Sequence, residues 1–268
     1  MAEVYIPILA YHRVIDGVDS PLAVPVAEFT RQLDWLAAQG YTGVPLADAV
    51  AARAGRLSGQ ACGRGGAGKN FKAFTLTFDH GYADNFRHVF PLLRERRIPA
   101  HFFLVTEPID SGALLALPGN PNTDKSRDRL MNWDEAMQLK EAGMGIGAMS
   151  ARHVDLTTVD AAAAKDEVEQ ARDAIRGFLG DDPDYFSWPF GHFSTPLKEM
   201  VKDAGFRGAV HTPAGKTGGM DRFSLRRIGI RPGMSEKVFA YKVSEQADLL
   251  RENPAKFAMM KALGKAFD

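Results

Sequence analysis

The chain of 268 residues has one cysteine, no excess of either charge and no long apolar run. Cys62 cannot form an internal disulfide, and no neighbouring base would activate its thiol, so we interpret it as incidental. Lys plus Arg and Asp plus Glu number 33 each, so no net charge would attract nucleic acid or an anionic membrane. Nowhere do roughly 18 apolar residues follow one another, the length that a membrane span needs.

The first residues also lack the pattern of an export signal. Residues 1–7 contain no basic region followed by a long apolar core. The chain as given is therefore expected to be cytoplasmic, with neither a signal peptide nor a transmembrane segment. Nucleic acid is not expected as a partner.

Short apolar runs alternate with amphipathic stretches along most of the chain. Strands are predicted at 4–10, 74–78, 100–105, 145–149, 185–188, 207–210 and 225–230, and helices at 25–39, 47–54, 85–96, 133–142, 158–179 and 195–204. About seven strands with helices between them predict one α/β domain over residues 1–268. Its expected form is an incomplete or distorted, TIM-like parallel (β/α)7 barrel with its site at the carboxyl ends of the strands.

Three segments interrupt this alternation. Residues 55–68 are rich in glycine but lack the strand-then-helix setting and the Lys-Ser/Thr ending of a phosphate loop, so a flexible surface loop is predicted. Residues 107–131 hold three prolines and are predicted to form a loop over the carboxyl ends of the strands. Residues 254–268, with lysines among apolar residues, predict an amphipathic helical tail at the C-terminus.

The most informative stretch is an apolar run that ends abruptly in polar residues. Residues 74–78 are β-branched or aromatic at nearly every position, which is typical of a strand covered on both faces, and Asp79 and His80 follow directly. His12 similarly follows the first predicted strand. The alternative is that Asp79 only caps the helix that begins after it.

Five motifs in order resemble the polysaccharide deacetylases that share the NodB homology domain, carbohydrate esterase family 4. Residues 77–82 resemble the first catalytic motif of that family, Thr-Phe-Asp-Asp-Gly-Tyr. Residues 146–153 lie where it has Gly-Ser-His-Thr/Ser-x-x-His, and 188–191 where it has Tyr-Pro-Tyr-Gly. Residues 6–14 are similar to its opening and 227–235 to its late strand and helix start. The resemblance covers most of the chain.

The resemblance implies a hydrolase of a carbon–nitrogen amide bond other than a peptide bond. The expected reaction is N-deacetylation of an amino sugar in the metabolism of a surface polysaccharide. In the family the first Asp is the base for a metal-bound water, and the second Asp with two histidines holds a divalent metal, often zinc. The metal polarises the acyl carbonyl and lowers the pKa of the water, while the carboxylate accepts the proton. Asp79 keeps the position of the base.

Two of the three ligand positions of that metal site are altered. His80 stands where the family has its metal-binding Asp and Met149 stands where it has the first His, so only His153 matches. A thioether suits copper(I) better than zinc, so the metal site is expected to be degenerate. The resemblance then gives Asp79, His80 and His153 as catalytic residues. His80 and His153 would be the ligands of any metal, with zinc the first choice, although a metal could be absent. A third donor could come from His12, His101, His192 or Asp79.

Other residues near the predicted strand ends are candidates for contact with the substrate. These are His12, Tyr82, Trp188, Pro189 and Phe190. Tyr82 could instead be packed core, Trp188 and Phe190 could fill the mouth of the barrel, and His12 and His101 could bind backbone carbonyls. Met149 is most simply a packing residue, and His88 and His211 are expected to have ordinary structural roles. Ser187 stands where many members carry an arginine that orients the base, so the charge environment of Asp79 stays open.

Three functions are compatible with these residues. The first is a hydrolase of an acylated amino sugar with Asp79 as base and His80 and His153 as metal ligands or polarising groups. The second is a catalytically silent family member that binds a glycan or a partner enzyme. The third is a metal-independent hydrolase of a small cyclic or linear amide, in which Asp79 activates water and a histidine stabilises the oxyanion. Retention of Asp79 favours hydrolysis over silence.

Overall fold

The computed structural model describes residues 5–53, 71–115, 117, 124, 127–213, 221–245 and 247. The predicted loop 55–68, with Cys62, and the predicted tail 254–268 lie outside the described residues. Within the described residues, none of the helices combines the length and the apolar composition needed to span a bilayer.

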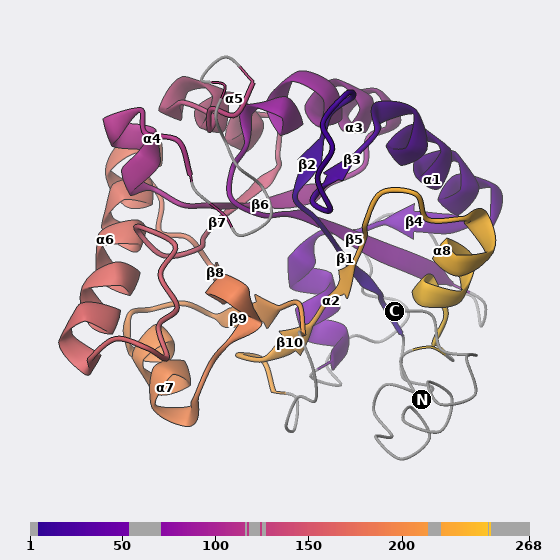
Figure 1. Ribbon diagram of the computed structural model, residues 1–268. Coiled ribbons are helices and arrows are strands. Elements are labelled where there is room, and N and C mark those ends of the chain that lie inside the picture. Colours follow the sequence, from indigo (N-terminus) through magenta and orange to yellow (C-terminus); the bar gives the residue numbers. More distant parts are fainter. Residues whose placement is uncertain are drawn as a thin grey trace.

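A ring of parallel strands forms the centre of the molecule (Figure 1). In ring order it contains β1 (Ile8–Tyr11), β5 (Lys72–Phe78), β6 (Ala100–Leu104), β7 (Gly145–Ala148), β8 (Tyr185–Ser187), β9 (Gly208–His211) and two short strands, β10 (Leu225–Arg226) and β11 (Ile228–Gly229). β10 pairs with β9, while β11 pairs with β1. One segment of chain therefore closes the ring, with Arg227 at the break between its two halves. The predicted (β/α)7 barrel is confirmed.

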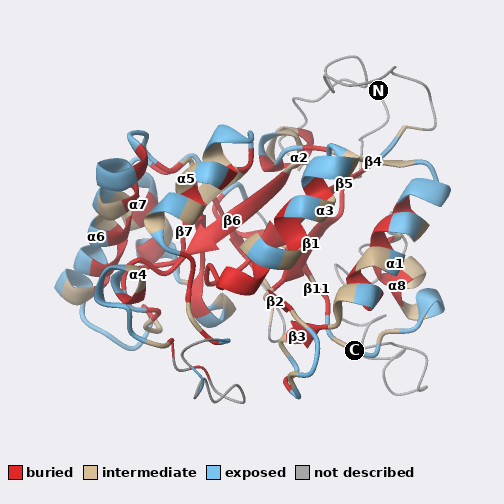
Figure 2. Cartoon of the chain, turned by 90° about the horizontal axis from the view of Figure 1, so that it is seen from above, coloured by how far each residue is buried: buried red, intermediate tan, exposed pale blue. Residues whose placement is uncertain are grey.

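Helices surround the ring and connect its strands. They are α1 (Val26–Ala38), α2 (Leu46–Arg53), η1 (Asn85–Val89), α3 (Phe90–Arg96), α4 (Glu107–Ser111), α5 (Trp133–Glu141), α6 (Ala161–Leu179), η2 (Pro189–Gly191), α7 (Thr195–Asp203) and α8 (Glu236–Val243). Figure 2 shows buried strands inside and helices whose outer faces are exposed. This layering explains the near-continuous apolar runs, because a parallel strand in a barrel is covered on both faces.

The alternation of side chains along each strand separates two apolar clusters. Phe102 and Leu104 of β6 belong to the outer cluster between strands and helices. Phe103, between them, belongs to the cluster that contains Ile8, Tyr185 and other residues of the barrel interior. Two-residue periodicity thus decides which side chains reach the interior and, at the strand ends, the site.

Capping residues set the starts of several helices where the sequence predicts them. Asn132 and Glu135 form a capping box at α5, with Glu135 N donating to Asn132 Oδ1 at 2.8 Å. α6 begins at Ala161, three residues after the predicted start at residue 158, and Asp160 caps it by accepting a hydrogen bond from Ala163 N. These caps leave the predicted boundaries within a few residues of those observed.

Four features differ from the sequence prediction. The predicted helix 85–96 begins with the π-helical turn η1, and α4 lies inside the predicted loop 107–131. The short strands β2 (Arg13–Val14), β3 (Ala23–Val24) and β4 (Tyr41–Gly43) have too few residues to show a periodicity. The predicted strand 225–230 is broken at Arg227, because the pairing changes there from β9 to β1: the N–H of Arg227 still donates to His211 O of β9 at 2.8 Å, whereas Ile228 pairs with Leu9 of β1.

Candidate active site

Asp79 and Arg227 form a bidentate ion pair inside the mouth of the barrel. Asp79 directly follows β5, and Arg227 reaches it from the break between β10 and β11. Arg227 Nη1 donates to Asp79 Oδ1 at 2.7 Å and Nη2 donates to Oδ2 at 2.6 Å. Both side chains are almost fully buried, at 1% and 2% exposure. This fork geometry fixes the plane of the carboxylate as well as its position.

Two hydroxyl groups complete the surroundings of this ion pair. Ser187 Oγ donates to Asp79 Oδ1 at 3.3 Å and accepts from Arg227 Nη2 at 3.0 Å. Thr77 Oγ1 accepts from Arg227 Nη1 at 3.1 Å and donates to Leu9 O at 2.8 Å. Many members of the resembling family carry an arginine at the position of Ser187. Here Ser187 lies beside the guanidinium of Arg227, which comes from a different part of the chain.

Sequence reasoning did not identify Arg227 as a partner of Asp79. A signal was present, because Arg227 lies two residues after Leu225, which faces the barrel interior. The alternation of strand side chains would have placed the guanidinium inside. The alternative for Asp79 as a helix cap is not supported, since Asp84 occupies the N-cap position of η1 and the side chain of Asp79 bonds to Ser187 and Arg227 inside the barrel.

Opposing influences act on the pKa of Asp79. Burial raises the pKa of this carboxyl group. The charge and hydrogen bonds of Arg227, with smaller contributions from His12 and His153, lower it by more than burial raises it, so the net pKa lies below its ordinary value. The group is therefore ionised at neutral pH. Oδ1 accepts from two side chains, whereas Oδ2 accepts from Arg227 and faces His12. Oδ2 is therefore the oxygen better placed to accept a hydrogen bond from a further donor.

His80 and His153 approach each other beside Asp79. His80 adopts a φ of 73° and Gly81 a φ of 80°, which turns the chain sharply after β5. His153 N donates to Ser150 Oγ at 2.9 Å, which holds the turn after β7. The two Nε2 atoms lie 3.2 Å apart, and both side chains belong to buried residues.

The rings of both histidines are held neutral. Burial, followed by the charges of His153, His12 and Arg227, lowers the pKa of His80 well below its usual range. Burial lowers the pKa of His153 to about 4, although Asp79 acts in the opposite direction. A neutral imidazole has one N–H donor and one acceptor nitrogen, so a hydrogen bond between the two Nε2 atoms requires complementary tautomers.

His12 lies on the other side of His80. The two rings stack with centroids 5.1 Å apart and an interplanar angle of 22°. His12 Nδ1 is 3.9 Å from Asp79 Oδ2, and its side chain retains 20% exposure. The backbone of His12 is fixed because Asn85 Nδ2 donates to its carbonyl at 2.8 Å. His12, His80 and His153 thus form a row of imidazoles along the carboxylate.

The donor set fits a three-ligand zinc site incompletely. Two imidazoles on one tetrahedral zinc ion would place their nitrogens about 3.3 Å apart, close to the 3.2 Å between His80 and His153. No group of three or more His, Cys, Asp or Glu side chains with the geometry of a metal site occurs in the described part of the chain. Met149 is buried in the apolar interior cluster, and the carboxylate of Asp79 is engaged by Arg227. The residues present therefore do not fit the metal site that the sequence resemblance implies.

The other proposed third donors lie elsewhere. His192 Nδ1 is 2.7 Å from Asp155 Oδ2 and half exposed. The ring of His101 fills the space where a side chain at Gly145 or Gly147 would stand, one layer deeper in the barrel than Phe103. Neither imidazole joins the His80–His153 pair.

The predicted substrate-contacting residues divide into accessible and buried ones. His12 is partly accessible, and Phe190 is 40% exposed with its ring 4.7 Å from that of His153. Trp188 is 1% exposed and its indole N–H donates to Phe223 O at 2.8 Å, so it packs in the outer core. Tyr82 is fully buried beneath the guanidinium of Arg13. Trp188 and Tyr82 have no surface to offer a sugar, and Pro189 is also buried.

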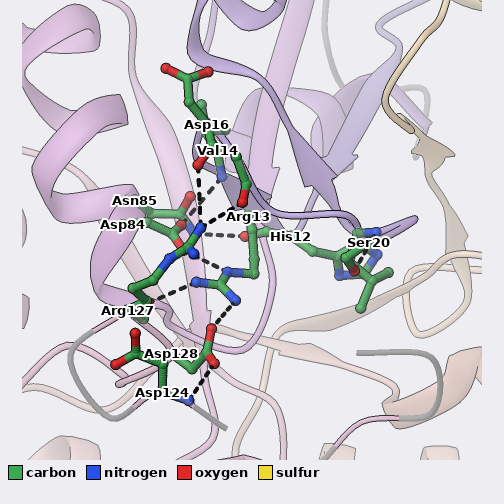
Figure 3. A network of polar contacts seen from close by, with 12 residues as sticks. His12, Arg13, Val14, Asp16, Ser20, Asp84, Asn85, Asp124, Arg127 and Asp128 are labelled. Carbon is green, nitrogen blue, oxygen red and sulfur yellow. Dashed lines mark hydrogen bonds and ion pairs between the residues drawn. The ribbon is translucent and has the colours of Figure 1, made fainter. Parts of the chain in front are cut away.

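A second arginine-centred network is built around Arg13, the residue after His12 (Figure 3). Arg13 Nε donates to Asp84 Oδ2 at 2.7 Å, Nη1 to Asp128 Oδ1 at 2.6 Å and Nη2 to Arg127 O at 2.8 Å. Arg13 is fully buried and directly follows His12. The network therefore ties the tip of β1 and the start of η1 to residues 127–128. The sequence analysis did not foresee it, because its members are far apart in the chain.

The same segment pairs with the turn that carries His80. Met131 N donates to Gly81 O at 2.8 Å, Ala83 N donates to Arg129 O at 3.1 Å, and Tyr82 and Leu130 form an antiparallel bridge. Residues 81–83 are thus held by main-chain hydrogen bonds while Arg13 holds Asp84. The turn after Asp79 has little freedom to rearrange.

Comparison with protein families gives one match. The model described as "Polysaccharide deacetylase" matches residues 66–209. A protein of Bacillus subtilis (strain 168) named "Putative polysaccharide deacetylase YxkH" is 21% identical over 236 residues, which are 87% of this chain and 74% of that protein.

Several solved structures share the fold. The Streptococcus pyogenes deacetylase PplD in complex with acetate has a TM-score of 0.72 at 20% identity, covering 91% of this chain and all of that one. A de-N-acetylase from Aggregatibacter actinomycetemcomitans has a TM-score of 0.69 at 18% identity, covering 88% and 99%. IcaB from Ammonifex degensii has a TM-score of 0.67 at 22% identity, covering 89% and 97%. At these identities the similarity concerns the fold.

Proposed function

The chain belongs to the polysaccharide deacetylase family, hydrolases of carbon–nitrogen bonds in amides, and we propose that it deacylates an N-acylated amino sugar with Asp79 as the base. The family expected from the five sequence motifs is confirmed. The observation that carries the proposal is the ionised carboxylate of Asp79, held by Arg227 at the mouth of the barrel. Parallel barrels place their chemistry at this end of the strands.

In the proposed reaction Asp79 moves one proton. Oδ2 accepts a proton from a water molecule as the water oxygen attacks the acyl carbon, and a tetrahedral intermediate forms. The carbon–nitrogen bond then breaks, and the same carboxyl group returns the proton to the leaving amine. Because Arg227 and His12 lower the pKa of Asp79, the protonated carboxyl is a strong acid for this second step. The products are a carboxylic acid and a free amino sugar.

The imidazole row supports this proposal from the other side of the carboxylate. His12, the most exposed of the three rings, lies 3.9 Å from Asp79 and is placed to contact the reacting amide. Hydrogen-bond donors that face the developing oxyanion lower the barrier of such reactions. Neutral imidazole N–H groups are donors of this kind.

The nature of the substrate is inferred from the rim of the site. Phe190 is an exposed aromatic residue next to His153 and adopts a φ of 58°, so its ring is held outside the core. An exposed aromatic face matches the apolar face of a sugar ring. The names of structurally similar proteins, deacetylase and de-N-acetylase, make the acetyl group the first acyl group to test.

The direct test compares Asp79→Asn with the unmodified chain. Release of acetate from a panel of N-acetylated amino-sugar oligomers is measured, and Asp79→Asn is expected to remove it while circular dichroism stays unchanged. Asp166→Asn, the same substitution on the exposed face of α6, is the matched control and should retain activity. Equal turnover by Asp79→Asn would refute the catalytic assignment.

A glycan-binding protein without catalysis is the second candidate. It is favoured by the joint change at His80 and Met149, two positions that hold the metal in the family. In that case no oligomer would be cleaved, but oligomers would still bind, with equal affinity to the unmodified chain and to Asp79→Asn. Phe190→Ala would then weaken binding.

A further inference from the structure

His80 and His153 contact each other at the position where the family holds its metal. We propose that this imidazole couple replaces the metal and that the site operates without a bound divalent ion. The inference builds on the proposed function but concerns the composition of the site, which can be measured without turnover. Its basis is the incomplete donor set, the tautomers of the two rings and the charge balance around Asp79.

The hydrogen bonds assign complementary tautomers to the couple. His80 Nδ1 is buried without a hydrogen-bond partner among the described residues, so the proton of this ring is assigned to Nε2, because buried N–H groups are rarely left without an acceptor. His80 Nε2–H then donates across the 3.2 Å gap. His153 Nε2 is then the acceptor, which places the proton of the His153 ring on Nδ1. Each ring nitrogen of the couple is therefore accounted for by neutral imidazoles.

The charge balance disfavours a divalent ion at this position. The buried charges next to the couple are those of Asp79 and Arg227, which cancel each other in a bidentate pair. The family's second Asp would supply a further negative charge, but His80 supplies none. A divalent cation would leave a net charge of about +2 in a buried site, and an uncompensated buried charge is strongly unfavourable.

In the part of the chain that the structure describes, no neighbouring side chain supplies the missing negative charge. Met149 is a neutral thioether packed in the apolar interior, and Ser150, the next residue, is occupied by the N–H of His153. His12 stacks on His80 and contributes no negative charge. The role that remains for the couple is to fill the position of the metal and to support the ring of His12, which stacks on His80 and takes no part in the hydrogen bond of the couple. An N–H of His12 can then hold the acyl oxygen by a hydrogen bond instead of a metal–oxygen bond.

The first experiment restores the family's ligands and measures zinc affinity. Zinc is titrated into the unmodified chain and into the double variant His80→Asp/Met149→His, in competition with a chromophoric chelator. Asp tolerates the positive φ at position 80, so the backbone can remain unchanged. The double variant should bind zinc at least about 100-fold more tightly, because even outer partners of a zinc ligand change affinity by about 10- to 100-fold.

The matched control adds His153→Gln to the double variant. This triple variant should lose the gain in affinity, because one of the three restored ligands is gone. If the gain persists, zinc is bound elsewhere and the assignment of the couple to the metal position fails.

The second experiment uses the unmodified chain and needs no engineered variant. Nitrogen-15 spectra of the histidine rings should show His80 protonated at Nε2 and His153 unprotonated at Nε2, with no change on addition of one equivalent of zinc. Protein purified without a metal-binding tag should retain no zinc, nickel, cobalt or copper after dialysis against a moderate chelator. A stoichiometric metal, or ring signals that shift with one equivalent of zinc, would overturn the proposal.

The two proposals fail in different ways. Acetate release from a chain that holds stoichiometric metal would contradict the couple but not the deacylation. A metal-free chain that cleaves no oligomer would contradict the deacylation but not the couple.

Discussion

Arg227 holds both carboxylate oxygens of Asp79 from the break between β10 and β11. The residue at the break between β10 and β11 therefore also fixes the orientation of the base. A residue at this position closes the ring of strands through its N–H, which donates to His211 O, and fixes the reactive group through its side chain. This relationship predicts how activity depends on pH.

Arg227→Gln should move the acid limb of the pH–activity profile to higher pH. The base is active when ionised, and the charge of Arg227 lowers the pKa of Asp79 against the effect of burial. Removing an opposite charge from a carboxyl group at this distance raises its pKa by about 1–3 units. Activity should therefore fall more at pH 5 than at pH 8. The profile of kcat/KM against pH measures this, and an acid limb that stays in place would contradict the role of Arg227.

Arg13→Met should destabilise the fold strongly. It leaves the carboxylate of Asp84 buried without the charge of Arg13, and breaking a buried pair in this way lowers the free energy of unfolding by about 3–5 kcal/mol. Arg96→Met, which removes an ion pair with the exposed Asp34, should change it by less than about 1 kcal/mol. Urea titrations of both variants provide the comparison, and equal effects would show that the buried network is not a stabilising element.

Asp84→Asn should partly rescue Arg13→Met. Burial raises the pKa of Asp84 to about 6 although Arg13 lowers it, so the folded chain holds this proton more tightly than the unfolded chain does. An amide at position 84 removes the buried charge that Arg13→Met leaves uncompensated. A double-mutant cycle in urea measures the coupling, and additive effects would argue against direct contact.

Acidification from pH 6.5 to pH 4 should destabilise the chain through its buried histidines. Burial lowers the pKa of His101 to about 3 and that of His211 to about 4, whereas an unfolded histidine titrates near 6.5. In this window the unfolded chain binds protons that the folded chain does not, so the free energy of unfolding falls as the pH falls. Each such histidine contributes a slope of up to about 1.4 kcal/mol per pH unit.

Asp84 acts in the opposite sense within this window. Its raised pKa means that the folded chain takes up a proton between about pH 6 and 3.8, which adds stability as the pH falls. Two or more histidines should outweigh this one carboxyl group. His211→Gln should flatten the slope measured by urea titrations at several pH values, while His88→Gln, on η1, serves as the control. An unchanged slope in His211→Gln would contradict the assignment.

Phe190→Ala should raise KM for an oligomer and leave kcat within a few-fold. The ring lies at the rim, next to His153, and touches no group that moves a proton in the proposed reaction. Phe178→Ala removes an exposed ring of α6 that stacks on Trp133, and it should leave KM unchanged. A fall in kcat alone would mean that Phe190 orients the histidines and does not bind sugar.

The sequence predicted the barrel well because its strands are covered on both faces and its helices are amphipathic. Periodicity, and the glycine and capping residues that end or begin elements, are local signals. The seven strands and the position of Asp79 at a strand end could therefore be predicted from the sequence. The family resemblance placed His80 and His153 at the ends of the two strands where they are found.

What sequence reasoning missed depends on contacts between distant residues. Trp188 follows Phe186 by two residues and so points to the outer core, which strand parity could have indicated. Arg227 and Asp79 are 148 residues apart, and Arg13 and Asp128 are 115 apart, so no local pattern reveals either pair. The partner of a charged residue buried in a barrel is decided by the closure of the whole ring.

The most direct test of this account is acetate release from N-acetylated amino-sugar oligomers by protein that has been dialysed against a chelator until no bound divalent metal is detected. The account predicts release by this metal-depleted chain at the rate of untreated protein, and none by Asp79→Asn under the same conditions. Release that appears only after a divalent metal is added, or that persists in Asp79→Asn, would contradict it.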